Sequence, residues 1–177
     1  MLGTKRVAHR SGPESLARVP IFAGMSREQL QRVWSIIELK HCPPGEVIVQ
    51  EGAAGDAMYL LLEGEVEVSK SLTLMVAKGS MDTRDKALDR MSAAHGPFFG
   101  EMALLGDNHQ RTATVRTLTK CTLGILRRSQ CMALCQEDPQ LGFVLMRNIA
   151  STLATRLDKA NKDILKLTTA FSLVLQE

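Results

Sequence analysis

A series of short apolar segments closed by turns constrains the fold of this chain more than any other feature of its sequence. Pro43-Pro44-Gly45 and the glycine-containing stretch 51–56 predict turns, because both residue types favour turn backbone. Apolar or alternating segments lie at 46–50, 57–62, 65–68, 87–94, 112–119 and 120–126. Strands of this length and spacing are typical of β-sandwiches and jelly-roll barrels. We therefore predict a mainly β fold, a jelly-roll barrel with flanking helices.

The stretch between the strands at 65–68 and 87–94 has a less regular pattern. Leu72, Leu74 and Val76 alternate with other residues, which predicts that the preceding strand is extended. The charged, glycine-containing stretch 78–86 predicts a long hairpin loop.

Helical patterns lie on both sides of the strands. Ser26 and Gln29 have the spacing of a capping box, and apolar residues follow at helical intervals, so we predict a helix at 27–37. Ser129 is expected to cap a short helix. Asp138-Pro139 supplies an acid at the N-cap and a proline in the first turn of a long helix.

The long helix carries an apolar seam with alternate steps of three and four residues. The seam consists of Ala150, Leu153, Leu157, Ala160, Ile164, Leu167, Phe171 and Val174. This spacing is typical of a coiled coil. We expect the first half to lie on the barrel of its own chain and the second half to form a parallel homodimer. An amphipathic helix that stays on its own chain is the alternative.

These patterns divide the chain into three parts. Residues 1–14 are polar and predicted to be a flexible N-terminus. Residues 15–137 form the predicted jelly-roll domain with its N-terminal helix, and residues 138–177 form the long C-terminal helix.

The segment 98–115, FFGEMALLGDNHQRTATV, contains the residues that point to a ligand. Gly100 lets the backbone approach a ligand closely, and the free N–H groups at the start of the helical turn 101–105 attract an anion. Arg111 can give paired hydrogen bonds to phosphate oxygens. Glu101 would repel phosphate and therefore suits a ribose hydroxyl. The order of acid, helical turn and arginine predicts a cradle for a nucleotide monophosphate.

This segment closely resembles the phosphate-binding cassette of cyclic nucleotide-binding domains, the family of the bacterial catabolite activator protein, kinase regulatory subunits and cyclic-nucleotide-gated channels. The resemblance runs from about Val19 to at least Leu157. It implies that Glu101 takes the ribose 2′-hydroxyl and that Arg111 takes the cyclic phosphate. It also implies dimerisation on the long helix.

The resemblance implies roles for further residues. It implies that Gly100, Met102 and Ala103 contribute backbone groups to the site. Thr112 and Ala113 are implied to line the phosphate, and Val68 to contact the base. On the long helix, Arg156 and Asn161 lie near where family members touch the glutamate and the purine. A threonine at position 112 also occurs in members that respond to cyclic GMP, so cyclic AMP and cyclic GMP both stay open as the ligand.

Bulk properties exclude several classes of protein. A formal charge of +3 without a dense Lys/Arg run gives no indication of nucleic-acid binding. No signal-peptide core and no stretch of about 20 apolar residues is present, so we expect a cytoplasmic protein without a membrane segment. The bacterial activators continue into a helix-turn-helix, whereas this sequence stops at Glu177. If it is complete, we expect no direct DNA binding.

The chain lacks the motifs of catalysis or metal binding. No serine or cysteine lies in a nucleophile motif, so no catalytic residue is assigned. Metal-dependent cupin enzymes, which have the same barrel, need clustered histidines. In this chain the histidines are scattered at His9, His41, His95 and His109. The cysteines form no CxxC pair and are expected to be reduced; they are Cys42, Cys121, Cys131 and Cys135. Cys131 and Cys135 share the apolar face of the predicted short helix and are expected to pack there as small hydrophobes.

These observations favour a non-enzymatic sensor that binds cyclic AMP or cyclic GMP and needs no other cofactor or metal. The sequence names no downstream partner. A dimerisation or scaffold module with a differently occupied pocket is the first alternative, and a metal-dependent cupin-like enzyme is the second.

Overall fold

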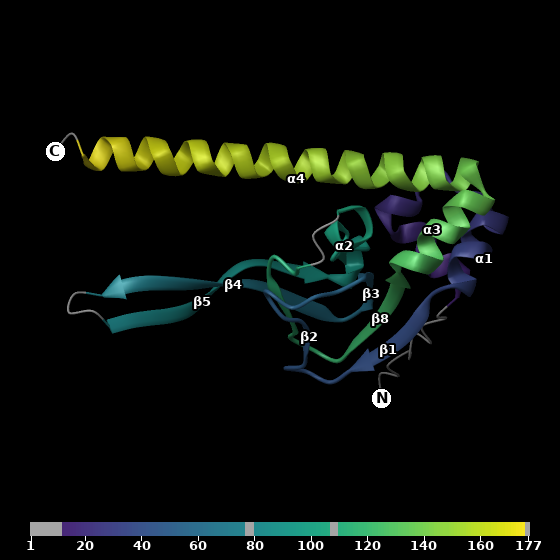
Figure 1. The fold of residues 1–177 in the computed structure, drawn as a ribbon, viewed down its shortest axis with the longest axis horizontal. Coiled ribbons are helices and arrows are strands. Elements are labelled where there is room, and N and C mark those ends of the chain that lie inside the picture. Colours follow the sequence, from purple (N-terminus) through teal and green to yellow (C-terminus); the bar gives the residue numbers. More distant parts are fainter. Residues whose placement is uncertain (1–11, 77–79, 107–109, 176–177) are drawn as a thin grey trace, which may run out of the picture.

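The computed structural model describes residues 12–76, 80–106 and 110–175 (Figure 1). These residues form two antiparallel four-stranded sheets with strand orders β1-β8-β3-β6 and β2-β7-β4-β5. The strands are β1 (Glu38–Cys42), β2 (Val47–Val49), β3 (Ala57–Glu63), β4 (Glu65–Val76), β5 (Ser80–Ser92), β6 (Phe98–Phe99), β7 (Thr114–Thr117) and β8 (Cys121–Arg127). The predicted jelly-roll barrel with flanking helices is confirmed.

Three strands differ from the sequence expectation: β1, β5 and β6, of which β6 is a two-residue strand that pairs with β3. β1 was not predicted. Four of its five residues are exposed, so it has no strong apolar pattern, and its pairing with β8 makes it a strand. The prediction of a loop at 78–86 is wrong, because β5 begins at Ser80 and pairs with β4 from Val76 onward. A charged composition indicates that a segment is exposed to solvent, but pairing with the neighbouring strand decides whether its backbone is extended.

Among the N-terminal helices, α1 follows its predicted signals closely, whereas the two helices before it were not predicted. Two short 3₁₀ helices, η1 (Pro13–Arg18) and η2 (Pro20–Phe22), precede α1 (Arg27–Ser35). Both bonds of the capping box are present: Gln29 N donates to Ser26 Oγ at 3.2 Å, and Ser26 N donates to Gln29 Oε1 at 3.0 Å. α1 ends two residues before the predicted boundary.

The helices that follow the barrel are α3 (Arg128–Glu137) and α4 (Pro139–Val174). Ser129 does not cap α3, because the helix begins one residue earlier and its N-cap is Arg127, without a side-chain cap. Arg128 N donates instead to Asp56 O at 2.7 Å, which fixes the exit from β8. Asp138 caps α4 as predicted, accepting a bond from Leu141 N at 3.0 Å.

The core consists of two clusters on opposite faces of the first sheet. Met58 and Leu60 of β3 pack with the helices, whereas Leu61 faces the barrel interior with Phe99 and Val115. Cys131 on α3 is 1% exposed and packs in the helix-side cluster. Burial raises the pKa of its thiol to about 12, so it stays protonated at neutral pH.

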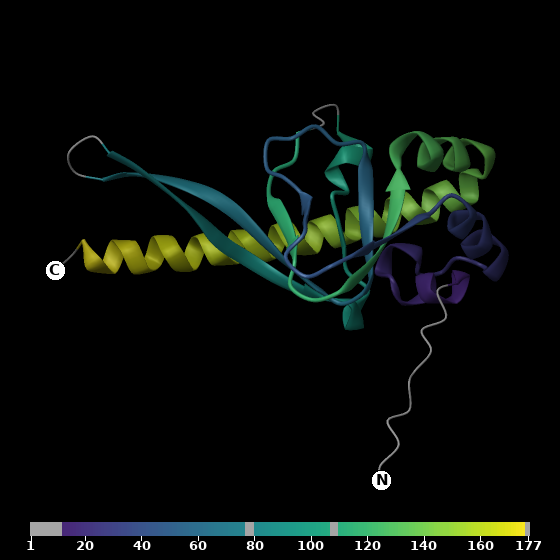
Figure 2. The same ribbon diagram turned by 90° about the horizontal axis from the view of Figure 1, so that it is seen from below.

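α4 extends far beyond the barrel. Its buried residues, Leu141, Gly142, Leu145 and Ile149, all lie in its first three turns, and every residue from 157 to 175 is exposed. Figures 1 and 2 show that the distal half of α4 and the β4–β5 ribbon project from the same end of the barrel. In the described part of the chain, no helix has the length and apolar character needed to cross a bilayer.

Candidate functional site

The cassette begins where β6 ends. Gly100 has φ +77°, a left-handed conformation that favours glycine. An added Cβ would lie 3.2 Å from Ala57 O and would meet the Arg111 guanidinium. Glu101 is the N-cap of the short helix α2 (Met102–Leu105), and Glu101, Met102 and Ala103 all line the same hollow.

Arg111 lies almost completely inside the protein, 8% exposed. Its Nη2 donates to Ala57 O at 2.8 Å, its Nη1 donates to Gly100 O at 3.4 Å, and its guanidinium lies 5.6 Å from the Tyr59 ring centroid. Among the described residues, no carboxylate pairs with it. A buried cation held only by carbonyl oxygens is a favourable position for an anion, because its charge is not neutralised by the protein.

The turn before β3 holds Arg111 in place. Arg111 N donates to Ala53 O, and Gly52 N donates to Arg111 O, each at 2.8 Å. Gly55 in the same turn lies so close that an added Cβ would overlap the guanidinium. The sequence predicted this stretch only as a turn. Its second role depends on the approach of Arg111 from more than 50 residues away, for which the sequence pattern has no signal.

Glu101 is 7% exposed and pairs with α4. Arg156 Nη1 lies 3.0 Å from Glu101 Oε1, and Arg156 Nη2 donates to Phe98 O at 2.9 Å. The Arg156 guanidinium also lies 4.7 Å from the Phe98 ring centroid. The structure therefore brings the long helix to the cassette through Arg156, at the position that the resemblance implied.

The other predicted residues lie at different distances from Glu101 and Arg156. Gly100, Glu101, Met102, Ala103, Arg111 and Thr112 line one hollow, together with Gln110, which was not predicted. Ala113 is half-buried beside it. Val68 on β4 packs against the interior cluster. Asn161 lies on the exposed part of α4, beyond Arg156, and makes no recorded hydrogen bond with the described residues.

The cassette hollow is small, about 60 Å³. Binding pockets for whole ligands are usually about 300 Å³ or larger. The hollow can therefore hold only part of such a ligand, and the walls for the rest would come from neighbouring elements such as β4 and α4.

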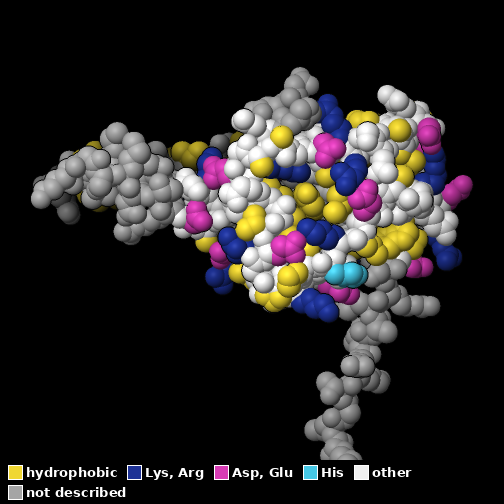
Figure 3. Space-filling model, turned by 60° about the horizontal axis from the view of Figure 1, so that its bottom comes forward, with side chains coloured by type: hydrophobic (Ala, Val, Ile, Leu, Met, Phe, Trp, Pro, Cys, Tyr) yellow, Lys and Arg dark blue, Asp and Glu magenta, His cyan; other side chains and the backbone are white. Residues whose placement is uncertain are grey.

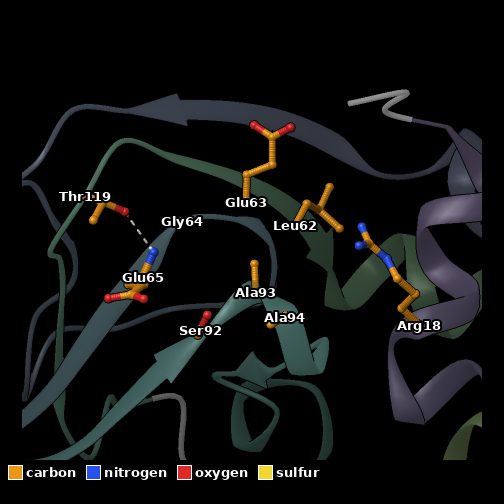
Figure 4. Close-up of a pocket in the computed structure, with 9 residues that line it drawn as sticks. All are labelled: Arg18, Leu62, Glu63, Gly64, Glu65, Ser92, Ala93, Ala94 and Thr119. Carbon is orange, nitrogen blue, oxygen red and sulfur yellow. Dashed lines mark hydrogen bonds between the residues drawn. The ribbon is translucent and has the colours of Figure 1, made fainter. Parts of the chain in front are cut away.

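A larger hollow of about 570 Å³ lies at the β3–β4 turn (Figure 4). Arg18 extends from η1 toward it, while Glu63 and Glu65 border it. The Thr119 hydroxyl accepts a bond from Glu65 N at 3.0 Å. Two carboxylates at its border disfavour a phosphate, so this hollow lacks the anion-binding character of the cassette.

Charges on the barrel face in Figure 3 are mixed in sign. Arg127 donates to Glu38 at 2.9 Å, and Lys40 lies 2.8 Å from Glu46. The hydrogen bond from Arg127 lowers the pKa of the Glu38 carboxyl. Within the described ranges, no cluster of three or more His, Cys, Asp or Glu side chains could hold a metal ion. His41 lies on β1 and His95 in the 3₁₀ turn η3 (Ala93–His95), while His9 and His109 lie outside the described residues.

Comparison with known proteins identifies the family. The family model described as cyclic nucleotide-binding domain matches residues 39–138, more than half of the 177-residue chain. The chain belongs to the cyclic nucleotide-binding domain family. The matched range contains the whole cassette, including Glu101 and Arg111, but not Arg156.

Curated relatives of this cyclic nucleotide-binding domain are much longer proteins. It is 28% identical over 126 residues to a putative potassium channel protein of Rhodopseudomonas palustris, covering 71% of this chain and 27% of that protein. It is 30% identical over 104 residues to the cGMP-dependent protein kinase, isozyme 1, of Drosophila melanogaster, covering 59% and 12%. The chain thus spans about a quarter or less of the length of these relatives.

Solved structures agree with the fold. The catabolite activator protein of Thermus thermophilus superposes with a TM-score of 0.68 at 28% identity, over 84% of this chain and 63% of that one. The cAMP-bound PfPKA-R superposes with a TM-score of 0.54 at 27% identity, over 69% and 39%.

Proposed function

We propose that this chain is a regulatory sensor that binds a cyclic nucleotide and performs no catalysis. The observation that carries this proposal is Arg111, a buried guanidinium without a carboxylate partner in the described part of the chain, placed in one hollow with the first turn of α2. Its charge suits a phosphate that bears a single negative charge, as a cyclic phosphodiester does.

Glu101 suits the ribose end of such a ligand. Arg156 donates a hydrogen bond to Glu101 Oε1. No described residue donates a hydrogen bond to Glu101 Oε2, which can therefore accept one from a hydroxyl group. A ribose hydroxyl at Glu101 would therefore lie beside the guanidinium that α4 supplies. In this proposal, the ligand changes how firmly α4 is held against the cassette, and α4 transmits the change.

Cyclic AMP is the first candidate, with cyclic GMP as the alternative. The cAMP-bound PfPKA-R and the cGMP-dependent kinase of Drosophila melanogaster both resemble this chain, so the comparisons leave the base open. Thr112, which lines the hollow, is compatible with either. The four free cysteines favour a reducing compartment, and we propose the cytoplasm.

We further propose a parallel homodimer through α4. In the heptad frame with Leu157 and Ile164 at a and Ala160 at d, Arg156 occupies position g. A g residue in a parallel pair lies beside the e residue five positions later on the facing helix. That residue is Asn161 of the partner subunit. The dimer would bring this amide next to Arg156 and so toward the nucleotide, although Asn161 is remote from the site of its own chain.

Titration calorimetry with cyclic AMP and cyclic GMP tests the ligand assignment. We expect wild-type protein to bind at least one nucleotide and Arg111→Ala to bind about a hundredfold or more weakly, because a charge-assisted pair of hydrogen bonds is removed. Arg116→Ala, which removes an exposed arginine that donates to Gly45 O, is the matched control and should bind normally.

Two results would contradict the proposal. Wild-type protein that binds neither nucleotide would favour a scaffold role. Undiminished binding by Arg111→Ala would show that another group receives the phosphate.

A further inference from the structure

A second groove, separate from the cassette hollow, lies between α2, α3 and α4. Its volume is about 520 Å³. Leu104 and Leu105 of α2 form one side, and Met132 and Cys135 of α3 form another. The α4 side consists of Pro139, Gly142, Phe143 and Met146. Apart from Arg128, whose Nη1 donates to Gly106 O at 2.9 Å, the side chains around the groove are apolar or sulfur-containing.

The apolar seam of α4 continues into this groove. Counting back from Ala150 by four and then three residues gives Met146 at d and Phe143 at a. Phe143 is 64% exposed, an unusual state for a phenylalanine on a helix that packs on the barrel. The seam from Phe143 to Val174 exceeds four heptads, more than the three to four that indicate a coiled coil.

The α4 residues of the groove have the arrangement of a knob-accepting hole. In a parallel two-stranded coil, a side chain at position a enters a hole formed by four residues of the facing helix. For Phe143, all four lie on the facing helix. They are the d and g residues just before its position 143, the a residue at position 143 itself and the d residue that follows. In this chain the four positions are occupied by Pro139, Gly142, Phe143 and Met146, the same residues that line the groove.

Gly142 gives this hole its depth. Because it has no side chain, α3 can approach closely and form the floor of the hole: a Cβ at Gly142 would lie only 3.0 Å from Cys135 Cβ. α3 therefore packs directly against the α4 backbone at this point, and the hole opens onto the sulfur atoms of α3 and the apolar end of α2.

Charges along the seam permit the parallel arrangement. The pairs that a parallel coil would form between g and following e residues are Gly142 with Arg147, Ile149 with Ala154, Arg156 with Asn161, Asp163 with Thr168, and Ala170 with Leu175. No pair places like charges together, so nothing electrostatic opposes this register.

We propose that the groove receives Phe143 of the partner subunit. The inference rests on the homodimer proposed above and adds a specific contact to it. By two-fold symmetry each subunit gives one phenylalanine and accepts one. Each phenylalanine then lies against Leu104 and Leu105, at the end of the helix whose first residues line the cassette hollow. The dimer contact and the ligand cassette thus share α2.

Cross-linking between two differently tagged chains tests this contact. One chain carries Phe143→Cys and Cys135→Ser, and the other is wild type with Cys135. After mixing, subunit exchange and treatment with a short thiol-to-thiol cross-linker, we expect peptides that join position 143 of the first chain to Cys135 of the second. The Cys135→Ser change prevents the same link within one chain. Cys42, Cys121 and Cys131 are each 1% exposed and should react poorly.

Two controls separate this inference from the dimer itself. Leu167→Cys lies at a d position of the seam and should cross-link to its own copy, whereas Leu165→Cys, equally exposed but outside the seam, should not. Cross-linking at 167 without a link from 143 to Cys135 would overturn the groove contact and leave the dimer standing. No cross-link at either position, with a monomer in sedimentation, would overturn both.

Phe143→Ala gives an independent measurement. We expect the dissociation constant of the dimer to rise about a hundredfold, roughly tenfold for each of two symmetric knobs. Phe143→Leu, which keeps an apolar knob, should change it much less. An unchanged constant for Phe143→Ala would contradict the proposed contact.

Discussion

Arg111 has a buried guanidinium whose recorded side-chain contacts are two carbonyl oxygens and an aromatic ring. Such a group is unfavourable to bury without compensation, since charged groups prefer water. The carbonyl groups satisfy part of its hydrogen-bonding capacity, but no described carboxylate neutralises its charge. An anion in the adjacent hollow would supply what the protein does not, and this is the residue-scale reason to expect a phosphate there.

Gly55 determines whether Arg111 can take this position. We predict that Gly55→Ala weakens cyclic nucleotide binding about tenfold or more, because the new methyl group would overlap the guanidinium and displace it. Calorimetric titration measures the effect, and thermal unfolding verifies that the variant is folded. Ala54→Ser, an exposed change in the same turn, is the control. Wild-type affinity in Gly55→Ala would show that Arg111 can bind from another position.

That the cassette residues lie together could be predicted from the sequence, because they are close to one another in the chain. Gly100, Glu101 and Arg111 lie within a dozen positions, and their spacing alone predicts a glycine turn, a helix N-terminus and a nearby cation. The contributions of Gly55 and Phe98 could not be predicted. Each depends on a side chain from a distant segment, and a glycine or a backbone carbonyl has no residue pattern that identifies such a role.

The joint between α3 and α4 is the element that sets the direction of the long helix. Asp138 Oδ1 accepts a bond from Leu141 N at 3.0 Å, and Asp138 Oδ2 lies 2.9 Å from Arg32 Nη1 on α1. One side chain thus caps α4 and joins it to the N-terminal helix. Asn148 adds a second connection, donating to Ile21 O and Ala23 O at 3.1 and 2.8 Å.

We predict that Asp138→Ala lowers the free energy of unfolding by about 1–2 kcal/mol, because it removes both the cap and the partly exposed ion pair. Chemical denaturation is the measurement. Asp138→Asn should lose less, since an asparagine can still cap a helix. Asp163→Ala removes an exposed ion pair with Lys166 and should change stability by about 0.5 kcal/mol or less. An equal loss in all three variants would contradict this account of the joint.

Prediction of whole elements succeeded where local patterns decided them. The capping box of α1 and the acid and proline at the start of α4 act within one turn, and both helices begin where these signals lie. The starts of α3 and of the strand β5 were predicted incorrectly. Hydrogen bonds to remote segments decide them: Arg128 N to Asp56 O for α3, and the ladder with β4 for β5.

At the scale of the whole molecule, the distal half of α4 is not buried by any part of its own chain that the structure describes. Leu157, Ile164, Leu167 and Phe171 are each more than half exposed. Burying such side chains contributes about 1.5–3 kcal/mol each, so a partner helix would gain substantial stability. The alternative of an amphipathic helix lying on its own barrel describes only the first half.

We predict that a chain ending at Asp163 keeps its fold but is monomeric. Residues 164–175 are all exposed, so the unfolding temperature at low protein concentration should stay close to that of the full chain. Sedimentation equilibrium measures the oligomeric state. Leu167→Asp in the full-length chain should have the same effect, since it places a charge in the seam. An unchanged dimer in both variants would place the interface elsewhere.

The sequence by itself determined the barrel, the cassette and the seam, because turn residues, helix caps and apolar periodicity act over a few neighbouring residues. Only the tertiary structure decided which remote residues these parts contact. It placed Arg156 at Glu101, 55 residues away, put Gly55 against Arg111, and joined α2, α3 and α4 around one groove. The physical reason is that contacts between remote segments depend on how whole elements pack, and no local pattern in the chain contains that information.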